Sequence, residues 1–195
     1  MIRFLTLAIT LMVLNSLPAQ PTKSPYFPTP EGTAWQYRLG EKKLTIRVAA
    51  HEKVGAQLCA KLETVLNGSV IAVQQVAETT AGIVRVSHNG EKITPPVLFL
   101  KLPVAKEQSW EVDSKIESPL GAVALTGKFS RSQEDVKVPA GEFKKAIRVK
   151  GEFTINGKPA AMTSWYAEKV GMVRQMISMD GQDYMLELEK YIEPK

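Results

Sequence analysis

Four dipeptides, each placed between two runs of alternating apolar and polar residues, constrain the fold of this chain more than any other feature. They are Asn67-Gly68, Asn89-Gly90, Asn156-Gly157 and Asp180-Gly181. A two-residue hairpin turn of type I′ needs positive φ at both central residues, and Asn-Gly and Asp-Gly reach these angles at the least steric cost. Four such turns predict a meander of sequential antiparallel hairpins.

The runs between the turns have a hydrophobic period of two, which is typical of strands buried on one side. The clearest run is the segment 143–155, where the apolar residues Phe143, Ile147, Val149, Phe153 and Ile155 share one face. Charged residues and threonine occupy the other face. An antiparallel sheet with one buried and one solvated face explains this pattern.

A further hairpin is predicted over residues 165–174. Trp165 and Tyr166 end one alternating run, a polar corner follows, and Gly171 begins the next run. The two aromatic side chains are large enough to anchor a sheet against its core.

No segment favours a helix over a strand. Residues 49–65 contain helix formers, but Gly55 interrupts them and leucines then recur at every second position. We count ten to twelve strands, and a sheet of that size has to curl. The sequence therefore predicts an all-β antiparallel meander that is curled into a barrel or a half-barrel.

Residues 1–19 have the pattern of a secretory signal peptide, with a positively charged start, an apolar run from Phe4 to Leu14 and a small residue at Ala19. An uncleaved N-terminal anchor is the alternative interpretation. Residues 20–33 form a Pro-rich leader, and residues 34–195 a single antiparallel β domain. We expect export to the periplasm, the cell envelope or the medium, and no stable membrane span after cleavage.

The charge pattern argues against nucleic-acid binding. The 195-residue chain has a formal net charge of +5, but its lysines and acidic residues are interleaved and no run of five like charges occurs. A nucleic-acid interface requires basic residues gathered on one face. We therefore expect no nucleic-acid partner.

The residues that could carry out catalysis are few and scattered. Cys59 is the single cysteine, and His51 and His88 are the two histidines, without metal-ligand spacing. Cys59 is interpreted as a small strand residue, with a nucleophilic thiol as the alternative. We therefore predict no enzymatic activity, no metal and no cofactor.

The methionines offer the one indication of a ligand site. Outside the signal segment all five methionines lie between residues 162 and 185. Methionine adapts to variable apolar shapes, although ordinary core packing is the alternative explanation. Strand alternation predicts that Met172 and Met176 share a face, with Met179 on the other. The candidate ligand-binding residues are Met162, Trp165, Tyr166, Met172 and Met176.

Three motifs resemble a group of exported bacterial β-proteins of unknown function. They are Phe27-Pro28 with Gly32-x-x-Trp35-x-Tyr37, Val138-Pro139-Ala140-Gly141-x-Phe143, and Trp165-Tyr166-Ala167 with Val170-Gly171-x-Val173. The outline of that group is similar to the half-barrel of lipoprotein carriers of the LolA and LolB type. The resemblance implies a curved sheet and export, but its motifs are structural corners, so no site residue is carried over.

Together these observations favour an exported, non-enzymatic β-protein that binds a lipid or another apolar ligand in its curved sheet. The alternative is a structural or adaptor protein of the cell envelope that acts through protein contacts. An enzyme based on Cys59 or a histidine is a third hypothesis, which would require His51 and Cys59 to meet in space.

Overall fold

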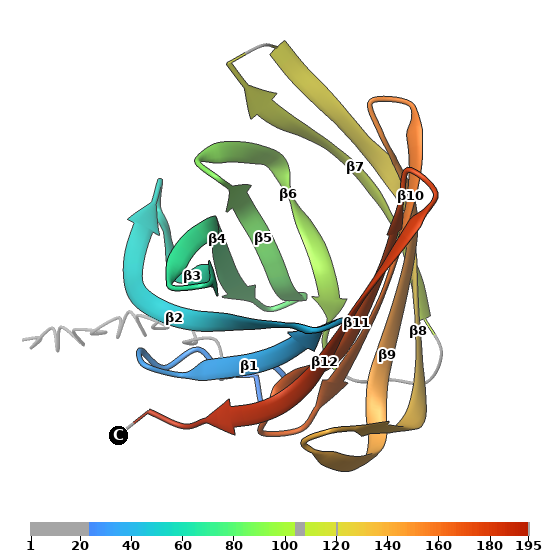
Figure 1. Cartoon of the computed structure of the whole chain (residues 1–195). Coiled ribbons are helices and arrows are strands. Elements are labelled where there is room, and N and C mark those ends of the chain that lie inside the picture. The colour runs from blue at the N-terminus through green and yellow to red at the C-terminus, as the bar shows by residue number, and fades with distance from the viewer. Residues whose placement is uncertain (1–23, 104–107, 120, 195) are drawn as a thin grey trace, which may run out of the picture.

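The structure, a computed structural model, describes residues 24–103, 108–119 and 121–194 (Figure 1). These residues form twelve strands and no helix, so none of them belongs to a helix that could span a membrane. The predicted signal peptide (residues 1–19) and the start of the leader lie outside the described residues.

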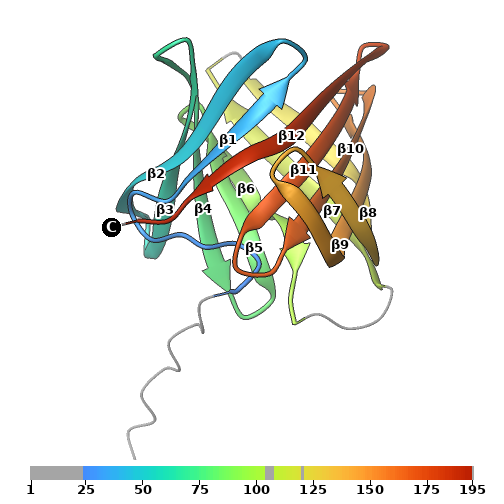
Figure 2. The same ribbon diagram turned by 60° about the horizontal axis from the view of Figure 1, so that its bottom comes forward.

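The strands follow one another in the chain as they do around the sheet. Their bounds are Ala34–Leu39 (β1), Lys42–Val54 (β2), Gln57–Leu66 (β3), Ser69–Thr79 (β4), Gly82–His88 (β5), Glu91–Lys101 (β6), Gln108–Ser118 (β7), Gly121–Val138 (β8), Gly141–Ile155 (β9), Lys158–Ala167 (β10), Gly171–Met179 (β11) and Gln182–Ile192 (β12). All neighbouring pairs are antiparallel, and β1 pairs with β12 to close a barrel (Figures 1 and 2). The predicted antiparallel meander is confirmed, and the barrel is a closed one.

All four predicted turns lie between paired strands. They join β3 to β4, β5 to β6, β9 to β10 and β11 to β12. In each turn φ is 50–51° at the Asn or Asp and 74–82° at the glycine. These positive angles are the ones that a type I′ turn requires, so the dipeptides fix the hairpins locally. The four turns lie at the same end of the barrel.

Interactions on both faces hold β1 to the last two strands, β11 and β12. Outside the barrel, Arg38 Nη2 donates to Glu187 Oε2 at 2.9 Å. Inside, the Tyr37 hydroxyl donates to the carbonyl oxygen of Met172 at 2.7 Å. The closure therefore combines a surface ion pair with a buried hydrogen bond.

The barrel has one short seam, between β6 and β7. These strands pair only through residues 92–94 and 115–117. Pro95 and Pro96 follow, and proline has no N–H to continue the ladder. Beyond them the Trp110 indole donates to the carbonyl oxygen of Leu98 at 2.7 Å, and Arg131 Nη1 donates to that of Lys101 at 2.7 Å. Side chains bridge the seam where the backbone ladder stops.

Residues 24–33 of the leader run along the end of the barrel opposite to the four turns (Figure 2). Phe27 is buried there, and its ring centre lies 5.5 Å from that of Phe99, 6.3 Å from that of Trp35 and 6.4 Å from that of Tyr166. The Trp35 indole also donates to the carbonyl oxygen of Val170 at 2.6 Å. We call Phe27, Trp35, Phe99 and Tyr166 the aromatic floor.

Candidate functional site

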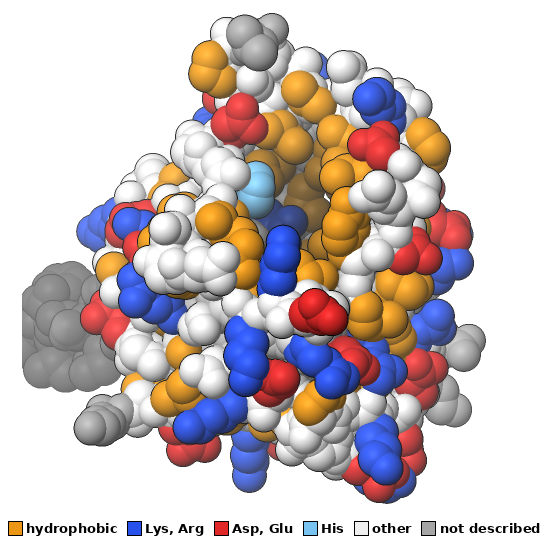
Figure 3. Space-filling model, viewed as in Figure 1, with side chains coloured by type: hydrophobic (Ala, Val, Ile, Leu, Met, Phe, Trp, Pro, Cys, Tyr) orange, Lys and Arg blue, Asp and Glu red, His pale blue; other side chains and the backbone are white. Residues whose placement is uncertain are grey.

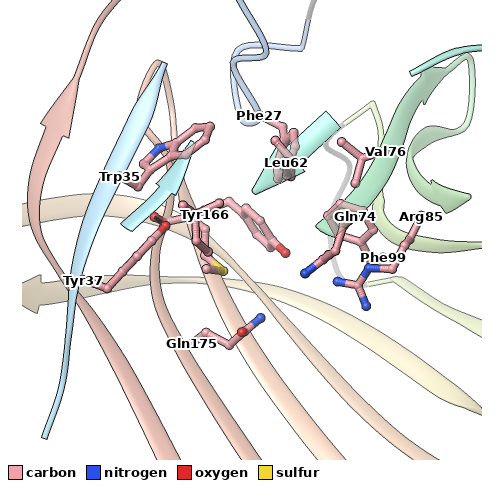
Figure 4. A pocket seen from close by; sticks show the side chains of 12 residues that line it. Phe27, Trp35, Tyr37, Leu62, Gln74, Val76, Arg85, Phe99, Tyr166 and Gln175 are labelled. Carbon is pink, nitrogen blue, oxygen red and sulfur yellow. Dashed lines mark hydrogen bonds between the residues drawn. The ribbon is translucent and has the colours of Figure 1, made fainter. Parts of the chain in front are cut away.

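A cavity lies inside the barrel on the aromatic floor (Figure 4). Its volume is about 70 Å³. Pockets for drug-sized ligands usually measure 300–1,000 Å³, so this cavity is much smaller. The cavity is therefore narrow, and it suits a head group or an unbranched chain better than a ring system.

Apolar side chains from both halves of the barrel form most of the wall. Ile46 of β2, Leu62 of β3, Val76 of β4 and Met172 of β11 line the cavity above the floor. The first three lie in alternating runs whose other face points out of the barrel, where charged residues such as Arg47 and Glu63 pair at 2.7 Å. Period-two patterning thus produces an apolar interior and a charged exterior.

A small polar group interrupts this apolar wall on the β10–β11 side. Gln175 Nε2 donates to the hydroxyl of Ser164 at 2.9 Å, and Ser164 is fully buried. The same Gln175 nitrogen lies 3.3 Å from the sulfur of Met162. Because Gln175 and Ser164 satisfy each other, this side of the cavity presents a fixed amide to any occupant.

Arg85 of β5 faces the cavity from the opposite wall. Its Cζ lies 5.5 Å from the centre of the Phe99 ring, a cation–π arrangement. Its Nε is buried and has no hydrogen-bond partner. Within residues 24–103, 108–119 and 121–194, no carboxylate forms an ion pair with Arg85. Burial lowers the pKa of its guanidinium, and Tyr166 opposes this effect.

Four polar side-chain groups point into the cavity. Figure 4 shows the amides of Gln74 and Gln175, the hydroxyl of Tyr166 and the guanidinium of Arg85 directed toward one another across the cavity. Burial raises the pKa of Tyr166 to about 12, a shift that a hydrogen bond from Ser164 and the charge of Arg85 reduce. The phenol is therefore neutral, and able to donate, at physiological pH.

His88 lies next to this polar group, because it pairs with Gln74 across β4 and β5. Its Nδ1 is buried without a partner, and its Nε2 lies 3.3 Å from the side-chain nitrogen of Asn89. Burial lowers the pKa of His88, the charge of Arg85 lowers it further, and Glu91 opposes both. The histidine therefore adds no positive charge to the site near neutral pH.

Beyond the polar group the inward strand faces are mostly apolar up to the end that carries the four turns, with Ser114 as a buried polar exception. The half-buried residues on the inward strand faces there are Leu39, Leu66, Ile116, Leu125, Phe153 and Ile177. Figure 3 shows this face of the molecule as a hollow whose wall is mostly hydrophobic, with a basic side chain at depth. We call these six residues the apolar mouth.

The structure divides the five predicted ligand-binding residues between the two faces of the sheet. Tyr166 and Met172 line the cavity, and Met162 is buried beside Gln175. Trp165 faces outward, where its indole donates to Glu134 at 2.6 Å and Arg148 and Arg174 lie over its ring. Met176 follows the inward-facing Gln175 and so lies on the outer face, beside Met185.

A β-bulge explains why the predicted alternation of methionines is wrong. Trp165 pairs with Arg174, but Tyr166 pairs with Met172, so Val173 is an extra residue in β11. A bulge shifts the alternation by one position. Met172 therefore faces the cavity, whereas Met176, which the sequence places on the same face, does not.

Sequence reasoning missed Arg85, Gln74, Gln175 and Phe27. Residues 83–86 are buried or half-buried on both faces of β5, so alternation does not reveal which way Arg85 points. Phe27 lies among prolines in the leader and has no strand periodicity at all. The one available signal was the charged residue within an otherwise apolar run, Ile83-Val84-Arg85-Val86.

The residues considered for catalysis do not come together. Cys59 faces Glu52 across β2 and β3, whereas His51 is the neighbour of Glu52 and lies on the opposite face. Burial raises the pKa of the Cys59 thiol. In the part of the chain that the structure describes, no three His, Cys, Asp or Glu side chains are grouped so as to hold a metal ion.

Two solved structures have a similar fold. A candidate lipoprotein from Parabacteroides distasonis ATCC 8503 is 15% identical, with a TM-score of 0.52, over 86% of this chain and 98% of its own. A candidate exported protein with a YmcC-like fold from Bacteroides fragilis NCTC 9343 is 17% identical, with a TM-score of 0.45, over 86% and 99%. At these identities the likeness concerns the fold alone.

Searches by sequence add nothing to this likeness, since no family model matches the chain and no curated protein matches it significantly. The predicted outline of the LolA and LolB carriers and the sequence motifs behind it are not confirmed by these comparisons.

Proposed function

We propose that this protein binds a lipid or another apolar molecule inside its barrel, as an exported protein without enzymatic activity. The observation that carries the proposal is the cavity on the aromatic floor, together with the hollow with a mostly hydrophobic wall that Figure 3 shows. A packed β-barrel of ordinary stability fills such a space with its own side chains. Export is supported by the N-terminal sequence and by the description of the Parabacteroides distasonis protein as a candidate lipoprotein.

The absence of enzymatic activity remains part of the proposal. A nucleophilic cysteine needs a lowered pKa and a nearby base. Cys59 has a raised pKa and points away from His51, so it meets neither condition. The polar residues of the cavity are amide, phenol and guanidinium groups that suit recognition, and they include no carboxylate that could act as a general base.

Binding of a neutral apolar fluorophore, N-phenyl-1-naphthylamine, tests the proposal. The fluorophore should brighten with the wild-type protein in a saturable manner. Ile46→Trp fills the cavity and should weaken this binding about tenfold or more, because the indole occupies the space of the probe. Thr45→Trp places the same bulk on the outer face of the same strand and should leave binding unchanged. Absence of saturable binding to the wild type, with no lipid extracted from protein purified from its host, would contradict the proposal.

One observation favours the alternative of an adaptor protein. Val70 and Ile71, at the start of β4, are 47% and 52% exposed. Exposed branched apolar residues at a hairpin tip are typical contact points for another protein. A photo-crosslinking residue at position 71 should then yield one discrete adduct in the host, and one at position 43 on the charged outer face should not. A diffuse pattern from both positions would contradict a specific partner.

A further inference from the structure

We propose that the ligand is an amphipathic anion, and that Arg85 binds its carboxylate or phosphate head while the apolar mouth holds its tail. This inference deepens the proposed function and rests on it. It names the chemical class of the ligand and the residue that selects it.

The first argument is that Arg85 lacks a countercharge. Arg38 and Arg174 pair with Glu187, Arg47 pairs with Glu63, and Arg148 pairs with Glu134. Arg131 donates to two backbone carbonyl oxygens at the β6–β7 seam. Among the arginines of the described ranges, Arg85 is thus the one that contacts neither a carboxylate nor a backbone oxygen, and its guanidinium lies over the Phe99 ring.

An unpaired cation in an apolar cavity is unfavourable unless something compensates it. Charged side chains are seldom buried without an ion pair, because the lost hydration has to be replaced. The guanidinium has five N–H donors in a planar fork that matches a carboxylate or a phosphate. Nε is buried with no acceptor, so at least one donor is free for a ligand.

The second argument is that the other polar groups of the cavity are suited to the same head group. Gln74, Gln175 and Tyr166 point toward the space in front of Arg85 (Figure 4). Gln74 and Tyr166 can each donate a hydrogen bond, and the phenol keeps its proton because burial raises its pKa. The N–H groups of Gln175 are already used by Ser164 and Met162. Two neutral donors beside one cation form a site for an anion, and the absence of a carboxylate from the lining removes repulsion.

The third argument concerns the tail. The polar group lies deep in the barrel, above the aromatic floor, and the apolar mouth continues from it to the turn end. On the other side of the polar group, Phe27 and Phe99 of the aromatic floor leave no room for a tail. A molecule whose head reaches Arg85 must therefore run its remainder past Leu39, Phe153 and Ile177. The narrow cavity favours an unbranched chain there.

Isothermal titration of the full mature chain with three twelve-carbon probes tests this inference. Dodecanoate, dodecyl phosphate and dodecanol share one tail and differ in the head. The wild type should bind at least one of the two anions about tenfold or more tightly than dodecanol, since hydrogen bonds to a charged group are the stronger ones. Comparison of the two anions identifies the head as carboxylate or phosphate.

Arg85→Met keeps the approximate length of the side chain but removes its charge. It should abolish the preference for the anionic probes over dodecanol and leave dodecanol binding unchanged. Arg85→Lys should retain part of the preference. Arg148→Met is the matched control, because it removes a cation from the outer face. If Arg85→Met does not fold, the Nε resonance of Arg85 in the wild type serves instead. It should move on addition of the preferred anion and stay in place with dodecanol.

Each result has a distinct meaning. If the wild type binds dodecanol and both anions with equal affinity, the inference is overturned and the proposed function stands. If Arg85→Met retains the preference, or the Nε resonance does not move, a group other than Arg85 recognises the head and the inference is again overturned. If none of the three probes binds, the proposed function fails together with it.

Discussion

The hydroxyl of Tyr37 donates a 2.7 Å hydrogen bond to the carbonyl oxygen of Met172, and this bond joins the first strand of the barrel to the bulge in β11. Both ends of the bond are buried, and burial raises the pKa of Tyr37 well above its usual value. A bulge leaves part of the strand ladder unpaired. The Tyr37 hydroxyl therefore supplies a hydrogen-bond donor to the Met172 carbonyl where the bulge interrupts the strand ladder.

Tyr37→Phe should lower the free energy of unfolding by about 1–3 kcal/mol, because the Met172 carbonyl is left buried without this donor. Urea unfolding followed by tryptophan fluorescence measures the change. Tyr184→Phe is the control, since Tyr184 is 43% exposed and its hydroxyl donates to nearby Gln182. Its effect should stay within about 0.5 kcal/mol. Equal effects of the two substitutions would contradict a structural role for the Tyr37 hydroxyl.

Tyr166 should make the stability of the protein sensitive to alkaline pH. Its pKa is raised to about 12 in the folded state, whereas an unfolded tyrosine titrates near pH 10. The folded state thus favours the neutral phenol, so the stabilisation is complete below pH 10 and is lost as the pH rises toward 12. The full loss is on the order of 2–3 kcal/mol.

Unfolding at pH 9, 10 and 11 in the wild type and in Tyr166→Phe measures this effect. The free energy of unfolding of the variant should fall less steeply over this range. Parallel pH profiles for the two proteins would show that Tyr166 has the same pKa in the folded and the unfolded state, which would contradict the prediction.

Phe27→Ala should remove the centre of the aromatic floor and lower the free energy of unfolding by about 3–5 kcal/mol. Phe27 is 8% exposed and contacts the rings of Trp35, Phe99 and Tyr166. Phe143→Ala is the control, because Phe143 is only half-buried and should give a smaller loss. Thermal unfolding of both variants compares them. A loss below about 1 kcal/mol for Phe27→Ala would mean that the leader does not hold the floor in place.

Gly151→Ala should be destabilising even though alanine is apolar and small. A Cβ atom at this position would lie 2.4 Å from the nearest atom of the Phe129 ring. Phe129 itself stacks between Trp110 and Phe153, at 5.6 and 6.2 Å between ring centres. Forcing the ring to move should lower the free energy of unfolding by about 1–3 kcal/mol.

Combining Gly151→Ala with Phe129→Leu tests whether the clash with the Phe129 ring causes the loss of stability. The smaller side chain should make room for the added methyl group, so the double variant should lose less stability than the sum of the two single variants. Additive losses would show that Gly151 is needed for another reason, such as backbone freedom.

The turns and the strands could be predicted from the sequence because local chemistry decides them. Asn67-Gly68 and Asp180-Gly181 adopt their positive φ angles wherever they occur between strands, so the antiparallel hairpins follow directly. Strand alternation then places most of the apolar residues inside. Closure of the barrel, in contrast, depends on β1 meeting β12, and no local signal reports that pairing.

The binding residues were harder to predict because three of them depend on irregular features. Met172 faces the cavity only because Val173 is bulged, and Trp165, its predicted companion, is held outside by Glu134. Arg85 lies in a run that is largely buried on both faces, where alternation carries no information. Phe27 reaches the interior from a leader without any periodicity.

Arg38 and Glu187, which meet across β1 and β12, are 149 residues apart in the chain. During folding, β1 therefore has no partner at its second edge until residues 182–192 are available to pair with it. Up to that moment the growing sheet exposes two unpaired edges, to which other strands can add. A chain of this topology is therefore open to strand addition by its neighbours until its last strand has paired with its first.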